Sequence, residues 1–283
     1  MAEAYALHTG AFGTAIVLEL RANLVAHAHS ETQIAFWLGG ARARAQVGAT
    51  VVDYSENIAL GANAFESHDM VLLDDSGPCL FLAFMLSKPW LDARSQALGR
   101  NFRFPSPRIP IHPALRQACW RVLDLILALD TPRAAVDEEV GLLLEAAIQA
   151  STEQVDVPPP ATFGPTLDHR LRKAIGHMRA HVAEKTTVDD IAAKVGLSRA
   201  HFFALFRDQL NATPQVFWSA VRVEEAMRRV SEGLPLTDVA LDLGFSAPGN
   251  FSRFFKEHTG VSPSIFRRAV RAPLPNTVTG IPR

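Results

Sequence analysis

Cysteine, tyrosine and long apolar runs are scarce in this chain of 283 residues, and the shortages exclude whole classes of protein. With only two cysteines, Cys79 and Cys119, the sequence cannot supply a disulfide framework or a cysteine-ligated zinc site. The longest apolar run, from Cys79 to Leu86, has eight residues, whereas a membrane helix needs about 20. No basic stretch followed by an apolar one opens the sequence. We therefore expect no export signal, no membrane contact and a reduced, cytoplasmic protein.

The net charge of −1 at pH 7 hides an uneven distribution along the chain. Residues 165–272 carry 16 Lys and Arg against 11 Asp and Glu, whereas the remainder carries 12 against 18. A basic region joined to an acidic one predicts that only the basic region meets a polyanion such as DNA.

Proline marks the point at which the chain divides. Three consecutive prolines and a later Gly-Pro step favour extended backbone over residues 151–166, which we interpret as a linker. Before it, residues 1–111 contain short apolar or alternating segments, such as 32–38, 43–52 and 80–86, separated by glycine-rich breaks. Short strands at near-regular spacing are typical of a barrel or a sandwich, and we expect a β-barrel here.

Residues 112–150 change to helical spacing on both sides of the segment Asp130-Thr131-Pro132. This pattern predicts two amphipathic helices packed as an antiparallel pair. Either their apolar faces pack on the barrel, or an exposed face pairs two protomers of a homodimer. The sequence leaves both interpretations open.

The C-terminal part contains one unit twice, at residues 187–210 and 235–258. Gly196 matches Gly244 at an offset of 48, whereas Phe202 and Phe206 match Phe251 and Phe255 at an offset of 49. The second copy therefore has one extra residue in its turn. Each copy predicts a short helix, a glycine turn that takes a positive φ, and a second helix with a buried phenylalanine pair.

Such a helix, turn and helix is the geometry with which many proteins place a second helix in the DNA major groove. We expect Ser198 and Ser246 to cap the second helix of each unit. A single unit could equally be a hairpin in a helical bundle, but two units with a basic surplus favour DNA binding. Thr213 and Pro214 begin a connecting helix that runs to about Glu232, roughly 28 Å long. It could hold two recognition helices near one DNA turn, about 34 Å, apart.

The stretch GFSAPGNFSRFFKEHTGVSPSIFRR, which covers the second recognition helix and the residues after it, resembles the most recognisable segment of the AraC/XylS family of bacterial transcription regulators. The resemblance extends over residues 167–271 and leaves 272–283 as a tail. It implies an all-α DNA-binding domain of seven helices with two helix-turn-helix units. It also implies a sequence-specific regulator, usually an activator that contacts RNA polymerase.

The outward positions of the two recognition helices are the candidate DNA contacts. Alanine and phenylalanine can touch thymine methyl groups, asparagine suits adenine, and arginine suits guanine or phosphate. The candidates are Arg199, Ala200, Phe203, Ala204 and Arg207 in the first helix, and Asn250, Ser252, Arg253 and Lys256 in the second.

A group of histidines distinguishes the N-terminal region. His27 and His29 share one face of an expected strand, with Gln33 shortly after and His68 farther along the chain. The set resembles that of cupins, which bind a metal with such residues, and of the cupin-like effector barrels of AraC-type regulators. Cupins usually have glutamate where this chain has Gln33, so we expect a metal-free pocket for a small-molecule effector and no cofactor. A bound divalent metal and purely structural histidines are the alternatives.

The sequence therefore predicts two domains, a cupin-like effector barrel with a helical pair and an all-α DNA-binding domain. We expect a transcription regulator that binds double-stranded DNA, RNA polymerase and an effector, and that forms a homodimer. No constellation typical of catalysis is present, so we expect no catalytic residue. A metal-dependent cupin enzyme fused to a DNA-binding domain and a constitutive regulator without an effector are the competing hypotheses.

Overall fold

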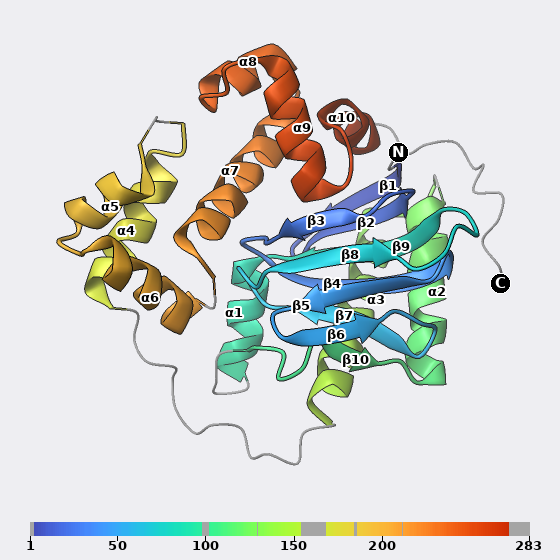
Figure 1. Cartoon of the computed structure of the whole chain (residues 1–283). Coiled ribbons are helices and arrows are strands. Elements are labelled where there is room, and N and C mark those ends of the chain that lie inside the picture. The colour runs from blue at the N-terminus through green and yellow to red at the C-terminus, as the bar shows by residue number, and fades with distance from the viewer. Residues whose placement is uncertain are drawn as a thin grey trace.

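The computed structural model describes residues 3–97, 102–128, 130–153, 168–183, 186–210 and 212–271. The expected linker lies outside these residues except for 151–153, and the expected tail lies wholly outside them. An N-terminal region rich in strands is followed by a C-terminal region built of helices (Figure 1). Within the described residues, the longest helices are too polar to cross a membrane.

The N-terminal strands form two open sheets, one of six strands and one of four. The strands are β1 (Glu3–Gly10), β2 (Gly13–Leu20), β3 (Leu24–His27), β4 (Thr32–Gly40), β5 (Ala43–Val47), β6 (Thr50–Asp53), β7 (Ile58–Ala62), β8 (His68–Leu72), β9 (Cys79–Leu86) and β10 (Arg108–Pro110). The larger sheet has the order β1-β2-β9-β4-β7-β10, and the smaller one has the order β3-β8-β5-β6. Because both sheets keep two edge strands, the described strands do not close into the barrel that we expected. The segment 43–52 also divides into two strands, β5 and β6, at a turn.

Strand β9 lies inside the larger sheet, and this position explains why residues 79–86 form an uninterrupted apolar run. It pairs antiparallel with β2 on one side and with β4 on the other. Its side chains alternate between two cores. Leu82 and Phe84 belong to the core that contains the helical pair, whereas Phe81 and Ala83 belong to a core shared with the C-terminal helices. Since both faces are covered, every position of β9 can be apolar.

The helical pair packs its predicted apolar faces on the larger sheet. Helices α2 (Pro113–Leu127) and α3 (Arg133–Glu153) lie against each other, and α1 (Lys88–Ala97) precedes them. Their buried side chains, including Val122 and Leu144, share one core with strands β2, β4 and β9. Helix α3 continues to Glu153, so the first three residues of the expected linker are helical.

Seven described helices make up the C-terminal region. They are α4 (His169–Ala180), α5 (Val188–Lys194), α6 (Arg199–Leu210), α7 (Pro214–Ser231), α8 (Leu236–Asp242), α9 (Pro248–Thr259) and α10 (Pro263–Arg271). Helices α4 to α6 stand away from the sheets, whereas α9 and α10 lie against them (Figure 1). Helix α9 contacts β3, and α10 contacts β1. The two halves of this region therefore meet different surroundings.

Candidate DNA-binding and effector sites

The two repeated units fold into matching helix pairs, α5–α6 and α8–α9. Gly196 and Gly244 end the first helix of each pair with φ of +72° and +74°, the left-handed region that glycine adopts at little cost. The phenylalanine pairs are fully buried beneath the second helices. The predicted segment 187–210 thus contains α5 and α6, and 235–258 contains α8 and nearly all of α9.

The turn of the second pair differs from the prediction at its cap. Helix α9 begins at Pro248 after Ala247, and no side chain among the described residues caps it. Ser246, the expected cap, instead accepts a hydrogen bond from the amide Nδ2 of Asn250 at 2.9 Å. The extra residue in this turn moves the helix start one position beyond the serine. Ser198 keeps its place in the first pair, where it accepts a long bond of 3.3 Å from the amide of His201.

The outer face of α6 is exposed but only partly basic. Arg199, Ala200, Ala204 and Arg207 are exposed, whereas Phe203 is half-buried. The guanidinium of Arg199 lies over the Phe203 ring, 4.9 Å from its centroid, and pairs with Asp189 of α5. The cation nearest the start of α6 is thus already engaged within its own unit.

The outer face of α9 presents a short polar chain. Asn250, Arg253 and Lys256 are exposed, whereas Ser252 is half-buried. Arg253 donates to the Oδ1 of Asn250 at 3.1 Å. The asparagine and the arginine, three residues apart, therefore form a connected donor and acceptor group on the surface of α9.

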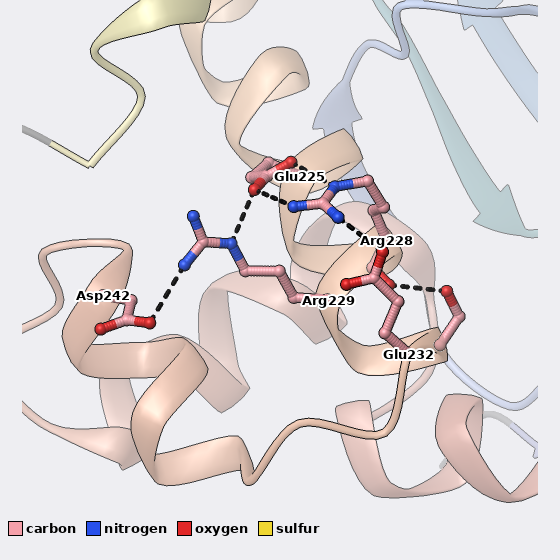
Figure 2. Close-up of polar contacts among 6 residues, drawn as sticks. Glu225, Arg228, Arg229, Glu232 and Asp242 are labelled. Atoms are coloured by element: carbon pink, nitrogen blue, oxygen red, sulfur yellow. Dashed lines mark hydrogen bonds and ion pairs between the residues drawn. The ribbon is translucent and has the colours of Figure 1, made fainter.

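One ion pair joins the connecting helix α7 to the second unit, and it belongs to a network of pairs within α7 (Figure 2). Glu225 accepts from Arg228 at 2.7 Å and from Arg229 at 2.6 Å, and Arg229 reaches Asp242 of α8 at 3.2 Å. These two arginines lower the pKa of Glu225 to about 2, first through the hydrogen bonds of Arg228. Arg222 adds a bond of 2.7 Å to the carbonyl of Leu243, in the turn itself. The second pair is therefore held in a defined orientation on α7.

In the N-terminal region, three histidines that are distant in sequence come together. His27 of β3 stands directly opposite His68 of β8 in the antiparallel register, and His29 follows two residues after His27. One ring nitrogen from each of the three lies within 4.8 Å of the others. All three side chains are buried, and burial lowers the pKa of His27 to about 3, with His68 contributing. Burial also lowers the pKa values of His29 and His68, so the three imidazoles are neutral at pH 7.

These histidines line a pocket that both regions of the chain enclose. The pocket has a volume of about 80 Å³, and its wall is mainly apolar. Strands β2, β4 and β9 supply one side, and Gln33 lies among their residues. The C-terminal region supplies Met227 of α7, His258 and Thr259 of α9, and Phe266 of α10. A molecule in this pocket would therefore touch the C-terminal end of α9.

The loop between β7 and β8 makes a second connection between the regions. Phe65 has a φ of +62°, the single positive value among the described residues that are not glycine. Its amide donates to the carbonyl of His29 at 2.6 Å. Its ring stacks on Phe217 of α7 with the centroids 4.2 Å apart. A backbone held in this costly region links the histidines to the core of the first helix pair.

Not all aromatic side chains of the N-terminal strands reach this pocket. Phe81 lines it, whereas Phe84 faces the helical pair and Phe36 and Trp37 line a separate cavity beside α2. Sequence reasoning missed His258 and Met227, because they reach the pocket from the other region. No local pattern could have identified them.

Comparisons with known proteins agree with the helical region. Residues 191–269 match the family model of a helix-turn-helix domain. The arabinose operon regulatory protein of Escherichia coli is 33% identical over 105 residues, which are 36% of each chain. The regulator CdhR of Pseudomonas aeruginosa is 27% identical over 144 residues, which are 50% of this chain and 42% of that one. The chain thus spans less than half the length of these curated relatives.

Solved structures extend the likeness to nearly the whole chain. Apo ToxT of Vibrio cholerae, as a single-residue variant, has a TM-score of 0.63 at 10% identity, covering 93% of this chain and 99% of that one. ToxT bound to an unsaturated fatty acid has a TM-score of 0.57 at 10% identity, covering 95% of each. At this identity, the likeness shows a shared two-part fold.

Proposed function

Residues 191–269 form a helix-turn-helix domain of the AraC type, and from this premise we propose that the chain is a sequence-specific DNA-binding regulator of transcription. The observation that carries the proposal is the repeated helix pair at the two ends of α7. With 18 residues, α7 is about 27 Å long, close to the separation of successive major grooves on one face of DNA. Helices α6 and α9 would enter those grooves.

Selection of binding sites from random duplex DNA tests this proposal directly. We expect a motif with two boxes about ten base pairs apart, and an affinity that falls as salt is raised. Arg207→Ala and Lys256→Ala should each weaken binding and reduce the salt dependence, because both would neutralise phosphates. Arg121→Ala, which removes an exposed arginine from α2, is the matched control. Failure to enrich any motif, with and without ligand candidates, would contradict the proposal.

The pocket between the two regions supports control by a small-molecule effector. A ligand there would contact the histidines on one side and α9 on the other. It would change DNA affinity only if it bound two arrangements of the regions unequally. ToxT, which shares this fold, has been solved with an unsaturated fatty acid. We therefore propose an effector with an apolar body and one polar end, His27, His29, Gln33 and His68 contributing the polar contacts.

A variant that fills the pocket tests the effector. Apolar carboxylic acids are screened on the full chain by thermal shift, and the strongest binder is then added to the DNA-binding assay. Met227→Trp should abolish the effect of that compound on DNA affinity, because the larger side chain occupies the cavity. Leu234→Trp, at an exposed position just after α7, is the control and should leave the effect intact. An equal response in both variants would place the ligand elsewhere.

We also propose that the regulator acts in the cytoplasm as a homodimer and contacts RNA polymerase. The dimer would use the outer face of the helical pair, on which Leu142 of α3 is a large apolar side chain with 55% exposure. Leu142→Glu should shift the molar mass measured by light scattering from dimer to monomer. Gln117→Glu, at an exposed position of α2, is the control for added charge. An unchanged dimer would remove this surface from the proposal.

A further inference from the structure

The three clustered histidines form an arrangement that an effector pocket alone does not require. Their ring nitrogens converge within 4.8 Å, and their side chains are nearly inaccessible to water. We propose that His27, His29 and His68 bind a divalent transition metal of the zinc class. Imidazole nitrogens suit Zn²⁺, Co²⁺, Ni²⁺ and Cu²⁺, whereas Mg²⁺ and Ca²⁺ require oxygen ligands.

Hydrogen bonds to the backbone prepare two of these rings for a metal. The Nδ1 of His27 lies 2.7 Å from the carbonyl oxygen of Val25, and the Nδ1 of His68 lies 2.9 Å from that of Glu66. Because a carbonyl only accepts, Nδ1 carries the proton in each ring, and Nε2 keeps its lone pair. Metal-binding histidines are typically oriented by such a bond on the opposite nitrogen.

The Nε2 of His68 has a lone pair that needs a partner. It is buried, and nothing in the described part of the chain forms a hydrogen bond with it. The same is true of the Oε1 of Gln33, which lines the same pocket. Buried polar atoms without partners are rare in folded proteins and often mark the place of an ion or a water. A metal would bind the nitrogen and leave the amide oxygen as a further possible ligand.

The spacing requires only a small closure. Ligand nitrogens of a tetrahedral zinc site, each about 2.05 Å from the metal, are roughly 3.3 Å apart. The present limit of 4.8 Å therefore calls for movements of about 1.5 Å or less. His29 lies beyond the end of β3 and can supply much of that movement, whereas His27 and His68 are fixed by strand pairing. Three protein ligands would leave one position open toward the pocket.

Metal binding would have a route to the helices on both sides of the site. The carbonyl of His29 accepts from Phe65, which stacks on Phe217, and His258 of α9 lies in the pocket wall. A closure at His29 would therefore move contacts of both helix pairs. This consequence for regulation rests on the proposed function, whereas the metal site itself does not.

Metal titration of the full chain, free of any affinity tag and treated with a chelator, tests the site. We expect one equivalent of Co²⁺ to give the visible absorption bands of a tetrahedral ion, and Zn²⁺ to displace it. Mg²⁺ should give no effect. His68→Gln and His29→Gln should each reduce Co²⁺ affinity at least tenfold. His258→Gln, in the same pocket wall but outside the cluster, should change it less than threefold.

A second histidine pair supplies the strictest control. His177 of α4 and His181, directly after that helix, have ring centroids 4.1 Å apart and could hold an ion at the surface. Loss of binding in His181→Gln, with full binding in His68→Gln, would overturn the proposal. Because buried substitutions can prevent folding, X-ray absorption of the zinc-loaded natural sequence is measured as well. Three imidazole ligands are expected, and fewer than two would overturn the site.

The DNA selection is run on chelator-treated protein, which separates the two proposals. A motif obtained without metal, together with no cobalt binding, would refute the metal site and leave the regulator standing. Cobalt binding without any DNA motif would do the reverse.

Discussion

The two helix pairs share a sequence pattern but are stabilised by different neighbours. The first pair packs with α4 and the start of α7 in a core that includes Met178, Phe206 and Phe217. The second pair belongs to the core that also contains sheet residues such as Leu20 and Phe81. The first pair is therefore stabilised mainly by other helices of the C-terminal region, whereas the second pair also packs against the N-terminal region. Any ligand in the shared pocket would therefore act first on the second unit.

The pairs also differ in how their helices begin. A capping box starts α5, in which Thr187 accepts from the amide of Asp190 at 3.1 Å and Asp190 accepts from the amide of Thr187 at 2.9 Å. Helix α8 begins after Pro235, and the described residues provide no side-chain cap for it. A local cap therefore helps to stabilise the first helix of the first unit, whereas the first helix of the second unit depends more on tertiary contacts.

The largest effect on stability should come from truncating one buried phenylalanine in each of the two cores. Phe206→Ala and Phe255→Ala should each lower the free energy of unfolding by about 3–5 kcal/mol, because both rings are fully buried. Only Phe255→Ala should also speed hydrogen exchange in β1 and β3, since its cavity opens in the shared core. Denaturant unfolding and exchange measured by mass spectrometry check both statements. Equal exchange in the sheets of both variants would break the comparison.

The next effect concerns the turn glycines. Gly196→Ala should cost about 1–2 kcal/mol, because its positive φ disfavours a Cβ but nothing lies within 4 Å of one. Gly244→Ala should cost clearly more, because the added Cβ would lie 2.7 Å from the carbonyl oxygen of Ala183. Gly249→Ala, at an open helical position, should not destabilise the protein and serves as the control. Thermal unfolding of the three variants ranks them, and a Gly196 cost equal to that of Gly244 would contradict the packing.

Local features of the sequence predict the repeated pairs well. The glycine at each turn and the phenylalanines four residues apart are short-range signals, and they report backbone conformation and a buried face directly. The strand β9 is likewise visible as an apolar run. The same logic failed at Ser246, because one inserted residue changes which position precedes the helix.

Long-range pairing explains what the sequence could not predict. That β9 lies between β2 and β4, and that the sheets stay open, depends on contacts between segments tens of residues apart. The pairing of His27 with His68 is of the same kind, although their residue type did suggest a site. His258 carries no local signal at all, because only the packing of α9 on β3 brings it to the pocket.

Substitutions at the proposed DNA contacts should have a smaller effect, and the loss of DNA affinity should differ between the two proposed recognition helices. Arg253→Ala should weaken binding to the selected site by about 1–3 kcal/mol and relax specificity at one base pair, if Arg253 reads a base. Arg199→Ala should cost less than about 1 kcal/mol, because that guanidinium is held by Asp189 and Phe203. Binding isotherms on the selected site and on its single-base variants measure both. A larger loss of DNA affinity in Arg199→Ala than in Arg253→Ala would show that α6, and not α9, makes the stronger arginine contact.

The smallest effect should come from the caps. Thr187→Ala should lower stability by about 1 kcal/mol, because it removes the acceptor for the amide of Asp190 and the partner in the capping box. Pro235→Ala, at the equivalent place before α8, removes no cap bond and should change stability by less than about 0.5 kcal/mol. Urea unfolding of both variants gives the comparison. If both substitutions lower the free energy of unfolding equally, the cap at Thr187 does not add to the stability of the first unit. That unit would then be stabilised by its packing with α4 alone.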